Sequence, residues 1–139
     1  MINEDITILV LSIFNVLIIA YVYYKYKMEI LEKIYLIVIT FGILLLLIKL
    51  IFNITTPFSI IIHYIYVLGI LFSPFVLKNN ILLFMSWINV FLLLTTRIFF
   101  EKCILSKYDG FNELPILVNV DRVGFIFLIL ITLRILKVF

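Results

Sequence analysis

The chain of 139 residues has only one cysteine, one histidine, three prolines and four glycines. A single thiol, Cys103, excludes an intrachain disulfide, a CxxC redox pair and a thiolate metal cluster. The glycines do not form a phosphate-binding loop, and the sequence contains neither an HExxH zinc motif nor a Ser-His-Asp set. We therefore expect no enzymatic activity and no bound cofactor.

Charge is also scarce, because charged residues make up 14% of the chain and hydrophobic residues 66%, with a mean hydropathy of +1.34. A soluble domain is roughly half apolar. The eleven Lys and Arg flank long apolar stretches, where such side chains reach lipid headgroups. This distribution predicts a protein dissolved in a lipid bilayer, which is its expected partner, and gives no sign of a nucleic-acid-binding surface.

Five apolar segments reach or approach the roughly 20 residues needed to cross a hydrocarbon core about 30 Å thick. The N-terminus is acidic where a secretory signal is basic, so we expect the first segment to be retained as an anchor. The predicted fold class is an all-α integral membrane protein, a compact bundle of four to five transmembrane helices forming one polytopic domain over residues 1–139. The predicted spans are residues 6–24, 34–52, 58–77, 81–100 and 123–139.

The fifth segment decides the topology, because its uninterrupted apolar run ends at Leu133, before Arg134 and Lys137. As a helix, residues 123–139 would be roughly 25 Å long, so they can cross if both cations extend to the headgroups. We favour five spans. The Lys and Arg then divide five to six between the two sides, which leaves the orientation open; with four spans they divide seven to four, and the N-terminus lies inside.

Residues 101–122 form the only extended polar segment. They contain the turn signal Asp109-Gly110 and the helix breaker Pro115, with apolar Ile104, Tyr108 and Phe111 at helical spacing. We expect this segment to connect the fourth and fifth spans along the membrane surface and to contact partner proteins.

Polar side chains recur on one face of the third and fourth segments. At 100° per residue they fall within an arc of roughly 80° on the third helix and roughly 100° on the fourth. The short turn at residues 78–80 makes these helices antiparallel neighbours, and lipid offers no hydrogen-bond partner, so the two stripes should face each other. With one residue from the first segment, the predicted interhelical polar seam comprises Asn15, Ser59, His63, Tyr66, Ser73, Ser86, Asn89, Thr96 and Arg97.

Asn15 belongs to the seam because it lies at nearly the same depth in the first span as Asn89 in the fourth. We predict a hydrogen bond between these two amides. His63 has two interpretations, a proton relay or haem ligand and a helix-packing residue; packing is favoured, since haem would need a second ligand from another subunit. Arg97 is interpreted as an interfacial anchor rather than a substrate-binding residue.

The function predicted from these features is that of a non-enzymatic, multi-pass structural or assembly component of a membrane complex or viral membrane, with other membrane proteins or a second copy as partners. The alternative is a small permease or channel-like oligomer with a polar path between its helices. A third interpretation, a membrane anchor for electron transfer, requires a partner subunit to supply the second haem ligand beside His63. Abundant Ile, Phe, Asn and Lys are typical of an AT-rich genome, so host, organellar and viral membranes are all compatible.

Overall fold

The computed structural model describes residues 4–52, 58–100 and 120–139, with the side chains of these residues except at 4, 58–60, 62–64, 66, 97–100 and 120–122. This part of the chain is all-helical, with five helices and no strands. The helices are α1 (Glu4–Lys25), α2 (Ile30–Phe52), α3 (Phe58–Val76), α4 (Asn80–Phe100) and α5 (Val120–Ile135).

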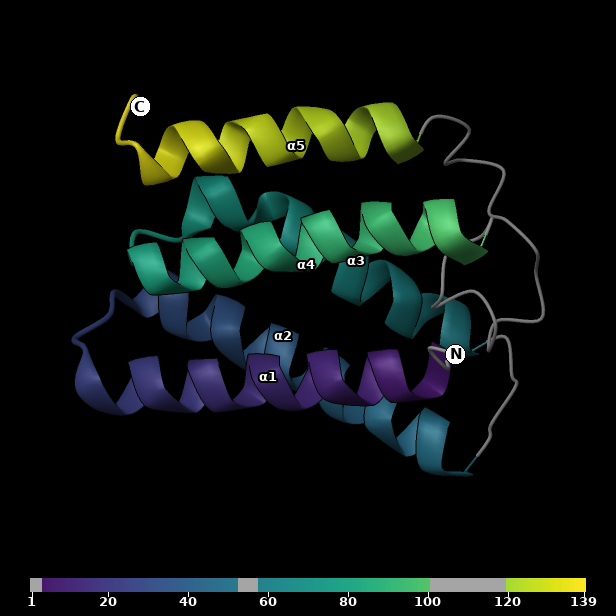
Figure 1. The fold of residues 1–139 in the computed structure, drawn as a ribbon. Helices are drawn as coiled ribbons and strands as arrows, with labels where there is room; N and C mark the ends of the chain where they lie inside the picture. The colour runs from purple at the N-terminus through teal and green to yellow at the C-terminus, as the bar shows by residue number, and fades with distance from the viewer. Residues whose placement is uncertain (1–3, 53–57, 101–119) are drawn as a thin grey trace.

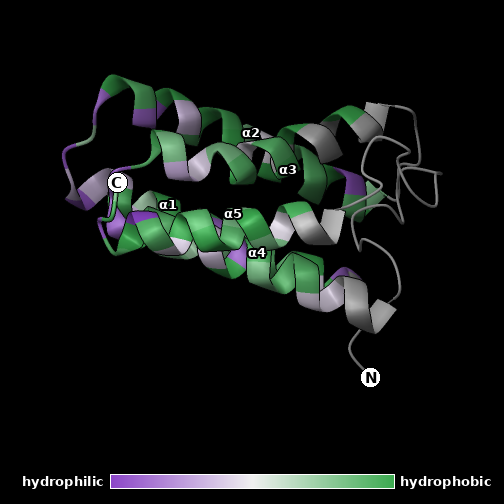
Figure 2. Cartoon of the chain, turned by 90° about the horizontal axis from the view of Figure 1, so that it is seen from above, coloured by the Kyte–Doolittle hydropathy of each residue, from purple (hydrophilic) through white to green (hydrophobic). Residues whose placement is uncertain are grey.

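The helices run up and down in a bundle of two layers (Figures 1 and 2). One layer holds α2 and α3, and the other holds α4 between α1 and α5. The most extensive packing is within the layers, between α2 and α3 and between α4 and α5, while α1 contacts α2, and α3 contacts α4 and α5, across them. The turns α1–α2 and α3–α4 and the C-terminal end of α5 therefore lie at the same end of the bundle.

Three helix boundaries differ from the predicted spans by three or more residues, and the others agree to within two. Helix α2 begins at Ile30 instead of residue 34, because a charged first turn can be helical although it is not apolar. Helix α5 begins at Val120, so residues 120–122 belong to it and not to the predicted surface segment, of which residues 101–119 lie outside the described part of the chain. It ends at Ile135, before residue 139, because the chain turns away in a helix-capping motif described below.

A continuous apolar core joins all five helices. It includes Ile8 and Val22 of α1, and every other helix contributes at least one side chain that is also almost fully buried. Those side chains are Leu36 and Ile43 of α2, Ile70 of α3, Leu82, Leu83 and Val90 of α4, and Ile131 of α5.

Large apolar side chains also cover the outside of the bundle. One example from each helix is 54% to 64% exposed: Leu17, Ile37, Phe72, Phe84 and Ile129. Figure 2 shows helices that are mostly hydrophobic along their length, with hydrophilic residues at the end formed by the two turns and a few farther along the bundle. Within the described residues, two helical segments are long and apolar enough to cross a membrane, Asp5–Lys25 and Ile30–Phe52.

Gly69 lies at a tight contact between α3 and α2. A Cβ atom at Gly69 would lie 2.0 Å from Cδ1 of Ile39, whereas one at Gly42 would lie 3.4 Å from Cγ2 of Ile65. The Tyr35 hydroxyl also donates a hydrogen bond to the Gly69 carbonyl oxygen.

We expect Gly69→Ala to lower the free energy of unfolding by about 1 kcal/mol, because Ile39 must leave its packed position. Gly42→Ala is the matched control. It should leave stability unchanged or raise it by about 0.5 kcal/mol, since alanine is the better helix former and the contact is tolerable. Unfolding titrations in detergent would measure both, and equal effects at the two glycines would contradict the packing assignment.

Candidate functional site

Two polar clusters stand out among the described residues, a buried amide pair in the interior and a larger group at the end of the bundle. The amide pair consists of Asn15 on α1 and Asn89 on α4, each 1% exposed. Nδ2 of Asn15 donates to Oδ1 of Asn89 at 2.8 Å, and Nδ2 of Asn89 donates to Oδ1 of Asn15 at 2.7 Å. The predicted hydrogen bond is present, and it is reciprocal.

Asn89 makes one further hydrogen bond, from Nδ2 to the Met85 carbonyl oxygen at 2.8 Å. Two amides that satisfy each other and their own helix can be buried without a large penalty. The pair therefore joins α1 to α4 and orients the two helices about their long axes.

The remaining members of the predicted seam divide into two groups. Ser73, Ser86 and Thr96 are buried, but the Thr96 hydroxyl donates to Leu93 of its own helix at 3.1 Å. The Ser73 hydroxyl has no hydrogen-bond partner in the described part of the chain. The side chains of Ser59, His63, Tyr66 and Arg97 lie outside the described residues, so a continuous seam stays a prediction.

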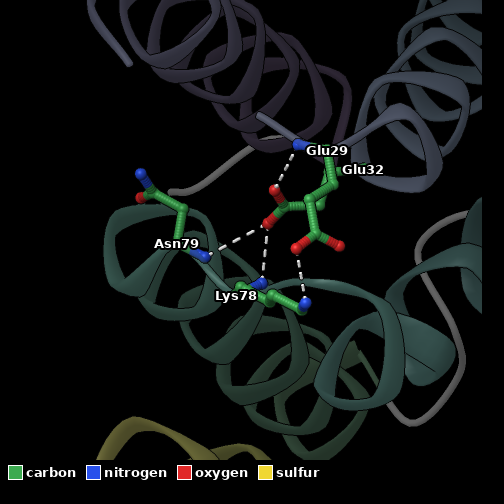
Figure 3. Close-up of polar contacts among 4 residues, drawn as sticks. All are labelled: Glu29, Glu32, Lys78 and Asn79. Atoms are coloured by element: carbon green, nitrogen blue, oxygen red, sulfur yellow. Dashed lines mark hydrogen bonds and ion pairs between the residues drawn. The ribbon is translucent and has the colours of Figure 1, made fainter. Parts of the chain in front are cut away.

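The larger cluster is organised around Glu32, a carboxylate that is only 4% exposed although it lies in the first turn of α2. Its Oε1 accepts hydrogen bonds from the backbone N–H groups of Lys78 at 2.7 Å and Asn79 at 3.3 Å, and its Oε2 accepts one from the N–H of Glu29 at 3.3 Å (Figure 3). A single side chain therefore caps its own helix and fixes the turn between α3 and α4.

The turn itself adds two contacts. The Lys78 ammonium forms an exposed ion pair with Oε1 of Glu29 at 2.6 Å, which links it to the α1–α2 turn. Oδ1 of Asn79 accepts the N–H groups of Ile81 at 2.9 Å and Leu82 at 3.4 Å, so Asn79 is the N-cap of α4. Hydrogen bonds and an ion pair therefore connect the α1–α2 turn to the α3–α4 turn.

Helix α5 ends at the same place with a Schellman motif. The N–H of Val138 bonds the Leu133 carbonyl and that of Lys137 bonds the Arg134 carbonyl, both at 3.0 Å. Lys137 has a φ of 57°, in the left-handed region where glycine is the usual residue. The Arg134 side chain reaches the C-terminal residue and donates from Nη1 to the Phe139 carbonyl oxygen at 2.6 Å.

We call this group the polar end, defined by Tyr26, Glu29, Glu32, Lys78, Asn79, Asn80 and Lys137. Six of the cations predicted to share one side of the membrane, Lys25, Lys27, Lys33, Lys78, Arg134 and Lys137, lie in or beside its turns and helix ends. Within the described ranges, no group of three or more His, Cys, Asp or Glu side chains could hold a metal ion. The polar end offers lysine, amide, phenol and carboxylate groups, with both carboxylates bonded within the two turns.

The organising role of Glu32 was missed in the sequence analysis, which began the second span at residue 34. Two acidic residues before an apolar run, Glu29 and Glu32, are a known signal for a helix start. That signal could have moved the boundary, but not revealed the bonds to Lys78 and Asn79, which are more than forty residues away.

Comparison of the chain with protein-family models, with curated proteins and with solved structures found no match.

Proposed function

We propose that the chain is a multi-pass integral membrane protein whose five helices cross the bilayer, and that it is a non-enzymatic structural or assembly component of a membrane complex. One observation carries the proposal. Large apolar side chains are exposed on every helix, whereas Ser12, Asn15, Ser73, Ser86 and Asn89 are buried. Water would favour the reverse arrangement, but lipid favours this one, because it solvates apolar groups and cannot hydrogen-bond to polar ones.

The helix lengths support five crossings. Helices α1 to α4 have 22, 23, 19 and 21 residues, and α5 has 16. At a rise of 1.5 Å per residue these are roughly 29 to 35 Å for the first four and roughly 24 Å for the fifth, against a hydrocarbon core of about 30 Å. The deficit of α5 is small enough for Arg134 and Lys137 to extend to the headgroups.

Aromatic and cationic residues at the C-terminal end of α1 support a membrane interface there. Tyr21, Tyr23, Tyr24 and Tyr26 are exposed, and the Lys25 ammonium donates to the Tyr21 hydroxyl at 2.8 Å. The same ammonium lies 5.2 Å from the centre of the Tyr21 ring. Tyrosine with lysine is the combination that anchors helices at headgroup depth.

A structural role agrees with what the interior polar groups do. Asn15 and Asn89 bond to each other, which joins helices, instead of presenting their amides to a path. The polar segment 101–119 supplies the surface for partner contacts in this proposal, as its composition indicates.

Alkaline carbonate extraction of membranes from expressing cells tests integration, because it removes proteins held only at the surface. The chain should stay in the pellet, and release into the supernatant would contradict the proposal. Purification from the native source in mild detergent then tests assembly. Recovery of the chain alone and monomeric would count against the assembly role, and solute flux through reconstituted protein would favour the permease alternative.

A further inference from the structure

A shallow pocket of about 290 Å³ opens at the polar end. Its walls come from three parts of the chain that meet only in the folded bundle: the end of α1, the turn into α4, and the residues after α5. Its volume is at the lower limit of pockets that bind small molecules. The lining residues are Tyr26, Lys78, Asn79, Asn80, Ile81 and Lys137.

Two lysines and no carboxylate line the pocket, although Glu29 balances the charge of one of them, Lys78, from outside the lining. The Lys78 ammonium uses one of its three donors on Glu29, which leaves two. The Lys137 ammonium has no hydrogen bond or ion pair to the described residues. The first turn of α4 also contributes Asn80 and Ile81, so the positive end of that helix dipole faces the same space.

Lys137 reaches the pocket because of the way α5 ends. It occupies the left-handed C′ position of the Schellman motif, with a φ of 57°. This helix cap turns the chain after α5 so that Lys137 lines one wall of the pocket.

The backbone of Lys78 is held in place by hydrogen bonds to Glu32. The backbone N–H groups of Lys78 and Asn79 both donate to Glu32. Asn79 in turn caps α4. The pocket wall is thus fixed before any ligand arrives, which lowers the entropy lost on binding.

We propose that this pocket binds a phosphate group, supplied in the membrane by the headgroup of an anionic lipid such as phosphatidic acid. The inference rests on the proposed function, since it places the polar end at headgroup depth. Lysine ammonium groups bind phosphate as point charges, and asparagine amides and the tyrosine hydroxyl can donate to its oxygens.

The test uses the full chain in phosphatidylcholine nanodiscs, with phosphatidic acid titrated in and bound lipid measured by native mass spectrometry. Lys78→Gln and Lys137→Gly should each weaken phosphatidic acid binding about five-fold, as expected for one cation near anionic lipid. The matched control is Lys27→Gln, which removes the same charge from the α1–α2 turn but not from the pocket wall. It should bind like the unmodified chain.

Lys137→Gly separates binding from folding, because it should raise the melting temperature while it weakens binding. Unchanged binding in this variant would overturn the proposal. Equal weakening of phosphatidic acid binding by Lys27→Gln and Lys78→Gln would also overturn the proposal. It would mean that the lipid is attracted by the overall positive charge of this end and not by the pocket.

A parallel titration of inorganic phosphate into detergent-solubilised protein separates the two sources. Phosphate binding with the same variant pattern, but no preference for phosphatidic acid, would assign the pocket to a soluble phosphate compound. Binding of neither overturns the site. Carbonate extraction keeps this outcome distinct from failure of the proposed function, since a chain that stays in the membrane but binds no phosphate contradicts only the pocket.

Discussion

Glu32→Ala is expected to lower the free energy of unfolding by about 3 kcal/mol, the largest effect of any single substitution considered for this chain. The carboxylate accepts three backbone N–H groups, two from the α3–α4 turn and one from the start of its own helix. Alanine leaves those donors without their acceptor at a position that is almost fully buried. Unfolding titrations in mixed detergent micelles would measure the loss.

Two further variants separate the buried hydrogen bonds from general loss of charge. Glu32→Gln keeps an acceptor oxygen, so it should lose about 1 kcal/mol. Glu29→Gln removes the exposed ion pair with Lys78 and should lose no more than about 0.5 kcal/mol, because exposed pairs contribute little. A Glu29 variant as destabilised as Glu32→Ala would show that charge balance, and not the buried bonds, holds the turns.

Asn89→Leu is expected to lower stability by about 1 to 2 kcal/mol, because both hydrogen bonds between the two amides are lost in a bilayer interior. Asn15→Leu should cost about 1 kcal/mol, since Asn89 keeps its bond to Met85. The double variant should lose clearly less than the sum of the two, because no amide is left unpaired.

This double-mutant cycle also distinguishes a structural pair from a conducting path. Strict additivity of the two losses would mean that the amides do not interact in the bilayer. A change in solute flux without a change in stability would support the permease alternative instead.

The positions of the five helices could be predicted from the sequence because each is a long apolar segment. The pairing of Asn15 with Asn89 could be predicted because the depth of a residue in a helix follows from the known rise per residue. Counting residues from each predicted interface placed the two amides level, and the structure joins them. The short turn at residues 78–80 likewise required antiparallel neighbours, and α3 and α4 contact each other across the two layers.

The polar end could not be predicted in the same way. Glu32 bonds to Lys78 and Asn79, so its role depends on how two distant turns meet and leaves no local pattern. The end of α5 was also unpredictable, because the left-handed position that stops the helix holds Lys137 and not the expected glycine. Apolar periodicity locates helices, but the contacts between their ends depend on tertiary structure.

The central claim, that five helices cross the bilayer, is tested most directly by labelling single cysteines in intact cells with a membrane-impermeant thiol reagent. The positions are native Cys103, and Lys27→Cys and Leu136→Cys, each introduced into a Cys103→Ser background. Five crossings place positions 27 and 136 on one side and Cys103 on the other, so the first two should label together and oppositely to Cys103. Labelling of position 136 together with Cys103, or of all three positions in intact cells, would contradict five crossings.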